Sequence, residues 1–190
     1  MAEPYSVILA DPAWQYADKS RHRGGAERHY PTMKVRDIAA LPVSDIAAPN
    51  AALFLWATWP TMPDALRVID AWGFRFRTCA FVWVKTTKAG NHHIGMGHYT
   101  RANTEPCLLA VRGRMPVASR AQRQVVLAER LKHSAKPVEV YDRIESLYPA
   151  GRRAELFARS ARPGWESFGH EIDGRCLSQS LIQEAAGHVR

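Results

Sequence analysis

The sequence has few cysteines, and they lie far apart. Cys79, Cys107 and Cys176 are the only three in 190 residues, and no two of them have the close spacing of a metal-binding pair. This argues against a disulfide-rich secreted domain and against a cysteine-based zinc site. We therefore expect three reduced thiols in a cytoplasmic protein.

Long apolar runs and targeting segments are also absent. No apolar stretch approaches the roughly 20 residues that cross a bilayer. The first residues, Met1-Ala2-Glu3-Pro4, lack the basic and apolar regions of a signal peptide. With 46% hydrophobic and 23% charged residues, the composition is that of a folded domain, and we expect no membrane partner.

Acidic residues are outnumbered by basic ones. The 26 lysines and arginines exceed the 18 aspartates and glutamates and give a formal net charge of +8. A basic surface suits a polyanion such as nucleic acid, although basic proteins without such a partner are common. The basic residues concentrate in two segments, one with Lys19, Arg21, His22, Arg23, Arg28 and His29, the other with Arg112, Arg114, Arg120 and Arg123.

Hydrophobic patterning predicts alternating strands and helices. Strands are expected at residues 5–10, 51–58, 76–84, 105–111, 125–127 and 152–158, and helices at residues 34–41, 61–72 and 137–147. This alternation predicts an α/β fold with a mostly parallel sheet and helices on both faces. In such sheets, ligands bind at the carboxyl ends of the strands.

Two long polar segments, at residues 17–29 and 85–103, follow expected strands. Loops of this length in a compact domain usually carry function or are disordered, and we expect both to overhang the same end of the sheet. His92, His93 and His98 lie in the second segment. Their spacing is irregular and no acidic or cysteine cluster accompanies them, so no metal site is expected.

Asp11-Pro12-Ala13-Trp14 directly follows the first expected strand. Pro12 fixes φ and lacks an N–H, so we expect the local carbonyls to have no N–H partners. A carboxylate and a carbonyl can together accept both hydrogen atoms of an amino group, and Trp14 offers a flat face for stacking. An ordinary structural turn explains the same four residues, and on their own they leave both interpretations open.

The order of further segments resembles that of the MT-A70 family of adenine N6-methyltransferases. The family signature Asp-Pro-Pro-Trp corresponds here to residues 11–14, with Ala13 in place of the second proline. It is followed in order by YPTM (30–33), LFLWAT (53–58), FVWVKT (81–86), EPCLLAVRG (105–113), SAKPVEVYDRIE (134–145), ELFAR (155–159) and GWESFGHEID (164–173). The resemblance implies a Rossmann-like methyltransferase fold that uses S-adenosylmethionine and no metal. It also implies one methyltransferase domain over residues 1–190, with a catalytic core at about residues 5–173 and a C-terminal tail at about residues 174–190.

The resemblance also implies roles for individual residues. Asp11 would accept a hydrogen bond from the adenine amino group, with the Pro12 carbonyl as second acceptor, and Trp14 would flank the base. Ala13 keeps the carbonyl of the residue it replaces, so we expect only a modest effect. The implied substrate-binding residues are Tyr30, Ser134 and Lys136, and the implied cofactor-binding residues are Asp11, Lys136, Glu155, Phe157, Arg159, His170 and Glu171.

The implied reaction is methyl transfer to N6 of adenine in nucleic acid, and DNA is favoured over RNA because the chain resembles short bacterial or phage members. The alternative is a catalytically inactive nucleic-acid-binding subunit of a methyltransferase complex, and either a homodimer or a partner subunit is compatible with this sequence. A target base must be flipped or single-stranded. The two basic segments are then expected to hold phosphates on either side of it.

Overall fold

The computed structural model describes residues 3–15, 32–95, 97, 99–131 and 135–188. Its centre is one sheet of seven strands in the order β5-β3-β4-β2-β1-β6-β7. The strands are β1 (Tyr5–Ala10), β2 (Ala47–Trp56), β3 (Arg75–Thr86), β4 (Thr104–Arg112), β5 (Val125–Glu129), β6 (Arg153–Leu156) and β7 (Glu166–Phe168). The predicted α/β fold with a mostly parallel sheet is confirmed.

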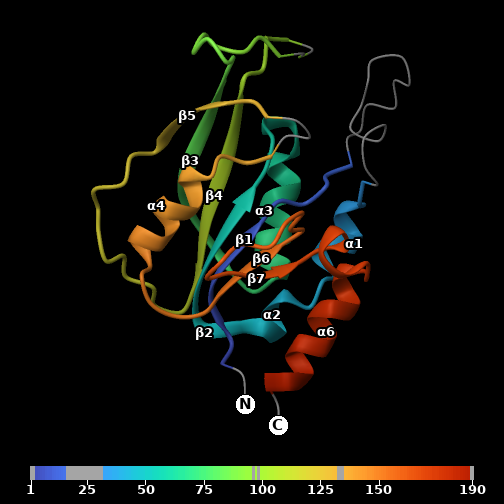
Figure 1. The fold of residues 1–190 in the computed structure, drawn as a ribbon. Coiled ribbons are helices and arrows are strands. Elements are labelled where there is room, and N and C mark those ends of the chain that lie inside the picture. The colour runs from blue at the N-terminus through green and yellow to red at the C-terminus, as the bar shows by residue number, and fades with distance from the viewer. Residues whose placement is uncertain (1–2, 16–31, 96, 98, 132–134, 189–190) are drawn as a thin grey trace.

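Among the described strands, β4 alone runs against its neighbours. It pairs antiparallel with β2 and β3, whereas the β1–β2, β1–β6, β3–β5 and β6–β7 pairs are parallel. The reversal arises because residues 87–103 join β3 to β4 with no described helix between them. The other six strands finish at one end of the sheet, which we call the carboxyl end, and β4 begins there. Figure 1 shows residues 87–103 extending beyond this end.

Helices cover both faces of the sheet, as predicted. They are α1 (Val35–Ala39), α2 (Val43–Ile46), α3 (Met62–Ala71), α4 (Glu139–Leu147), α5 (His170–Asp173) and α6 (Leu177–His188), with a 3-10 turn η2 (Trp59–Thr61) before α3. Successive strand residues point to opposite faces, so Ile8 and Ala10 of β1 pack in one apolar cluster with residues of α1, α3 and α6. Val7 and Leu9 pack in a second cluster with residues of α4. Figure 1 shows α4 apart from α1, α3 and α6.

The last helix lies in the stretch predicted to follow the catalytic core. Within residues 174–190, residues 177–188 form α6, whose Leu177 and Leu181 are buried against the first cluster. Its apolar residues are few, so the sequence gives it a weak helical pattern. The predicted C-terminal cap of α3 is confirmed, since the helix ends just before Gly73, which has φ 78. The short elements α2, β7 and α5 were not predicted.

Candidate active site

Asp11 stands at the carboxyl end of the sheet, directly after the last residue of β1, where a strand end was expected. β1 lies between β2 and β6, so this position is central. The backbone N–H of Asp11 donates to the Leu156 carbonyl of β6 at 3.4 Å and holds the residue beside the end of that strand. The side chain remains partly exposed. Asp11 is therefore open to a ligand that approaches the carboxyl end.

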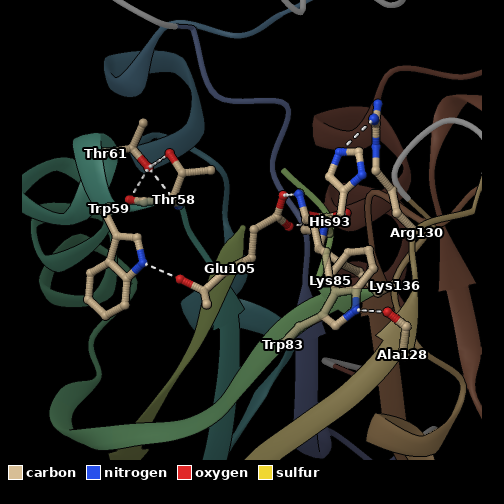
Figure 2. Close-up of polar contacts among 12 residues, drawn as sticks. Thr58, Trp59, Thr61, Trp83, Lys85, His93, Glu105, Ala128, Arg130 and Lys136 are labelled. Carbon is tan, nitrogen blue, oxygen red and sulfur yellow. Dashed lines mark hydrogen bonds and ion pairs between the residues drawn. The ribbon is translucent and has the colours of Figure 1, made fainter. Parts of the chain in front are cut away.

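Four charged side chains from separate segments meet here. The Lys136 ammonium lies 2.6 Å from Oδ2 of Asp11 and 3.4 Å from Oε2 of Glu105. Lys85 of β3 forms a hydrogen-bonded ion pair with Oε1 of Glu105. We call Asp11, Lys136, Glu105 and Lys85 the ion chain, because acidic and basic groups alternate along it. Figure 2 shows the Glu105 carboxylate with the two lysines.

The middle of the ion chain is largely shielded from water, since the side chains of Lys136 and Glu105 are 10% and 14% exposed. Burial alone would raise the pKa of Glu105, but the ammonium groups of Lys136 and Lys85 outweigh it and hold the pKa below its ordinary value. Two indole rings lie beside the lysines. Lys136 Nζ is 5.4 Å from the centre of the Trp56 ring, and Lys85 Nζ is 5.0 Å from that of Trp83. The surroundings therefore favour the charged form of Glu105.

Two carbonyl groups of the turn after β1 accept backbone hydrogen bonds, contrary to expectation. The Pro12 carbonyl accepts a hydrogen bond from the Trp14 N–H at 2.9 Å, and the Ala13 carbonyl accepts one from the Met33 N–H at 2.8 Å. The expectation that these carbonyls lack N–H partners is therefore wrong. A carbonyl oxygen has two lone pairs, so the Pro12 oxygen keeps the capacity for a second hydrogen bond.

Trp14 is buried, contrary to the expectation of an open stacking face. Its side chain is 5% exposed and packs in the first apolar cluster. Its Nε1–H donates to the Trp56 carbonyl at 3.0 Å, which satisfies the polar atom of the buried indole. A ring held in this way has no free face for a base, so its visible role is to fix the turn that carries Asp11.

Several expected cofactor-binding residues lie at the ends of β6 and β7, beside Asp11. Glu155 of β6 accepts a hydrogen bond from the Tyr141 hydroxyl at 2.7 Å. Burial raises the pKa of Glu155 despite that hydrogen bond, and the charge of Asp11 adds to the rise. Phe157, which follows β6, has φ 64, a conformation that is uncommon for a residue with a side chain and is often found at functional sites. The structure thus places Glu155 and Phe157 in and directly after β6, next to Asp11.

The remaining predicted residues are less closely grouped. Arg159 and Glu171 approach each other, with 3.9 Å between Nε and Oε1. His170 is exposed at the start of α5, after β7. Tyr30 and Ser134 lie outside the described residues. The structure therefore brings together Asp11, Lys136, Glu155 and Phe157, with Arg159, His170 and Glu171 farther along the same end of the sheet.

The donor set around Lys136 fits the amino-acid end of S-adenosylmethionine. That group carries an ammonium and a carboxylate, which match the side chains of Asp11 and Lys136. Trp56 supplies an independent observation, because its Nε1 is buried and has no hydrogen-bond partner among the described residues. A buried N–H of this kind is usually satisfied by a ligand or by water.

The second basic segment corrects another expectation. Arg112 ends β4 opposite Ala51, so it and Arg114 lie at the amino end of the sheet, away from Asp11. The chain next joins the sheet at Val125, which pairs with Val82 in the middle of β3. The expectation that this segment holds phosphates beside the target base is therefore wrong for Arg112 and Arg114. The first basic segment lies outside the described residues.

His92 and His93, the described histidines of the β3–β4 connection, form no metal-holding group with described acidic side chains. His93 contacts Arg130, with 3.3 Å between His93 Nε2 and Arg130 Nη1, and His98 lies outside the described residues. In the described part of the chain, no group of three or more His, Cys, Asp or Glu side chains is arranged to hold a metal ion. All three cysteines are free thiols, as expected. None of the described helices is long and apolar enough to cross a membrane.

Glu105, Lys85 and Tyr141 were not among the predicted site residues. Lys85 and Glu105 stand at the two ends of the β3–β4 connection. Their opposite charges at the two ends of a long polar loop were visible in the sequence and could have indicated an ion pair. Tyr141 gave no such signal, because its spacing on α4 is that of an ordinary packing residue.

Comparisons with known proteins show which family the sequence matches. Residues 5–171 match the family model described as MT-A70. The chain is 35% identical over 187 residues to a type II methyltransferase, M.MunI, from Mycoplasma sp, and the alignment covers 88% of this chain and 78% of that protein. It is 30% identical to an N(6)-adenosine-methyltransferase MT-A70-like protein of Arabidopsis thaliana, over 93% of this chain and 25% of the plant protein. It is 29% identical to the N(6)-adenosine-methyltransferase catalytic subunit METTL3 of Homo sapiens, over 90% of this chain and 28% of the human protein.

Proposed function

The chain belongs to the MT-A70 family of methyltransferases, and on this premise we propose that it transfers a methyl group from S-adenosylmethionine to N6 of adenine in DNA. The observation that carries the proposal is the contact between Asp11 and Lys136 at the carboxyl end of the sheet. These residues belong to two family-like segments that are distant in sequence. Their meeting at a ligand-binding position supports a common role.

Asp11 suits an amine substrate. The adenine amino nitrogen is a poor nucleophile because its lone pair is delocalised into the ring. Acceptors aimed at its two hydrogens favour a pyramidal nitrogen, whose lone pair can point at the methyl donor. Asp11 also places negative charge where positive charge develops on nitrogen, and preorganised groups of this kind typically contribute about 3–4 kcal/mol.

Lys136 already occupies one oxygen of Asp11, but this does not prevent amine binding. An ionised carboxylate has two oxygens and about four lone-pair sites, so Asp11 can accept from Lys136 and from an amine together. Lys136 holds the Asp11 carboxylate in place, and Glu105 restrains Lys136 from the other side. The ion chain thus orients the acceptor before substrate arrives.

S-Adenosylmethionine would supply an electrophilic methyl group on a sulfonium. Lys136 and Asp11 would hold its amino-acid end, and Trp56 Nε1 offers a donor beside them. Glu155 is a candidate acceptor for ribose hydroxyls, as is Glu171, which lies after β7. Each of these assignments rests on position at the carboxyl end and on the family resemblance.

DNA is favoured because of the resemblance to short bacterial or phage members. In keeping with this, the bacterial type II methyltransferase is matched over 78% of its length, whereas the chain spans 25% and 28% of the plant and human relatives. A base inside a duplex stack cannot reach Asp11, so the target adenine must be flipped or single-stranded. We place the protein in the cytoplasm, with DNA as its partner and a second subunit as an option.

The proposal is tested by incubating the purified protein with labelled S-adenosylmethionine and adenine-containing DNA, with matched RNA in parallel. Label recovered as N6-methyladenine in DNA supports it. Transfer to RNA alone would mean that the substrate is RNA and not DNA. Cofactor binding without transfer to either would overturn the proposal. DNA binding without cofactor binding would favour the inactive partner subunit instead.

A further inference from the structure

Trp59 is exposed, unlike every other tryptophan in the protein. All six tryptophans lie in the described residues, and five of them are no more than 7% exposed, whereas Trp59 is 51% exposed. Single exposed apolar residues are common on protein surfaces and need no explanation by themselves. The surroundings of Trp59 therefore decide whether it has a function.

The Trp59 ring is held in place despite its exposure. It begins η2 directly after Thr58, whose backbone N–H donates to Thr61 Oγ1 at 3.0 Å, while the two hydroxyl oxygens lie 3.1 Å apart. The indole Nε1–H donates to Thr104 Oγ1 at 2.8 Å. Its polar atom is thus satisfied by the protein, and the ring is oriented without being covered. A rigid aromatic ring loses little entropy when a flat ligand stacks on it.

The ring also lies at the carboxyl end of the sheet. Trp59 follows the end of β2, and its partner Thr104 immediately precedes Glu105 of the ion chain. Thr104 and Glu105 are the first two residues of β4, and adjacent strand residues point to opposite faces. Trp59 and the ion chain therefore lie on the two sides of the start of β4. Figure 2 shows Trp59 on one side of Glu105, with Lys85 and Lys136 on the other. A strand that crosses this end of the sheet could contact both.

Cationic groups occupy the same end of the molecule. Lys88 and Arg101 are exposed on the β3–β4 connection. Arg130, which follows β5, lies beside His93 of that connection. Exposed aromatic rings combined with cationic side chains are the common means of binding a single nucleic-acid strand, since rings stack on bases and cations bind phosphates.

We propose that Trp59 is a substrate-binding residue that stacks on a base next to the target adenine in single-stranded or locally opened DNA. The inference rests on the proposed function and adds the path of the DNA strand. The strand crosses the carboxyl end of the sheet, with the target adenine at Asp11 and a neighbouring base on Trp59. Because every base has a flat face, the contact tolerates any neighbouring base.

The test measures binding of a short single-stranded oligodeoxythymidine that carries one central adenine. Trp59→Ala should weaken binding about fivefold or more, and Trp59→Phe, which keeps a flat ring, should restore most of it. Phe76→Ala is the matched control, because Phe76 is also exposed but lies near the start of β3, at the amino end of the sheet. It should leave binding unchanged. An RNA strand of the same sequence tells whether the contact distinguishes the two nucleic acids.

Two further readouts do not depend on activity. Acrylamide should quench the Trp59 emission of the free protein, and the oligonucleotide should protect it. In addition, abasic sites placed next to the adenine should weaken binding by wild type but have little effect on binding by Trp59→Ala. The variant has already lost the ring on which the missing base would stack, so removing the base costs nothing further. Thermal denaturation checks that each variant is folded.

Equal binding by wild type and Trp59→Ala, or no protection of Trp59 by bound DNA, would overturn the inference. Failure of wild type to bind the strand at all would overturn it as well. The proposed function is judged separately, by methyl transfer. If Trp59→Ala methylates DNA with the KM of wild type, the stacking contact is refuted and the methyltransferase stands. If no DNA is methylated although Trp59 is protected, the methyltransferase fails instead.

Discussion

The ammonium of Lys136 lies 2.6 Å from Oδ2 of Asp11, although 125 positions separate the two residues in sequence. Asp11 directly follows β1, an inner strand of the sheet, and Lys136 precedes α4, so the contact joins the sheet to the segment that covers one face. The same ammonium reaches Glu105 of β4. This one side chain therefore connects three segments at the carboxyl end of the sheet, and changes to it test the site directly.

Lys136→Met should weaken S-adenosylmethionine binding about tenfold or more, because hydrogen bonds to charged groups contribute roughly 1.5–3 kcal/mol. The measurement is a calorimetric titration. Lys85→Met is the matched control, since it removes an ammonium from the same Glu105 but not from Asp11. Equal losses in the two variants would argue that Lys136 acts only by neutralising Glu105.

Glu105→Gln should lower the free energy of unfolding by about 3 kcal/mol at pH 7, because it removes the carboxylate paired with the partly buried Lys85 ammonium and leaves Lys136 with Asp11 as its ion-pair partner. Glu139→Gln removes a carboxylate from a more exposed pair with Arg143 and should cost about 0.5 kcal/mol or less. Urea denaturation measures the free energy of unfolding of both variants and of wild type.

The Glu105 effect should depend on pH in a defined direction. The folded state lowers the pKa of Glu105, so its stabilisation is present above the unfolded pKa of about 4.3 and is lost as pH falls through the folded value. The difference between wild type and Glu105→Gln should therefore shrink in acid. A difference that grows as pH falls would contradict the assigned ion pairs.

Glu155→Gln should show the opposite dependence. The folded state raises the pKa of Glu155, so ionisation costs stability as pH rises from the unfolded pKa of about 4.3 through the folded value. The variant retains an oxygen that can accept from Tyr141. At pH 7 it should be as stable as wild type or more stable, and the two should converge below about pH 4. A variant that loses stability steadily as pH rises would refute this account of the buried carboxylate.

Leu181→Ala tests whether the C-terminal helix is part of the packed core. Leu181 is fully buried, so the change should cost about 2–4 kcal/mol. Its neighbour Ile182 is 60% exposed, and Ile182→Ala should cost less than about 0.5 kcal/mol. Equal, small effects in thermal and urea denaturation would mean that α6 contributes little to stability.

The sequence was most informative where hydrophobic periodicity and strand ends coincide. The apolar run before Asp11 is a buried strand in the centre of the sheet, so a carboxylate after it had to lie at the carboxyl end. The direction of β4 was not evident in the same way. The hydrophobic pattern of a buried strand is the same whichever way the strand runs. β4 runs antiparallel to β3 because the two strands are joined directly.

Side-chain environments were harder to predict than positions. Trp14 has the same sequence signal whether its ring points outward or into the core, and the structure shows it inward, bonded to the Trp56 carbonyl. Arg112 and Arg114 belong to a basic cluster in sequence, but β4 carries them to the amino end of the sheet. Both errors arose because spacing along the chain gives no information on tertiary contacts.

Methyl transfer to adenine at Asp11 is tested by measuring N6-methyladenine in nucleic acids from cells that lack adenine methylation of their own. DNA and RNA are digested to nucleosides and measured by mass spectrometry after expression of wild type or Asp11→Asn, an isosteric change that removes the negative charge. We expect N6-methyladenine in DNA with wild type and none above background with Asp11→Asn, although the variant is folded. Equal N6-methyladenine with Asp11→Asn, or none in either nucleic acid with folded wild type, would contradict it.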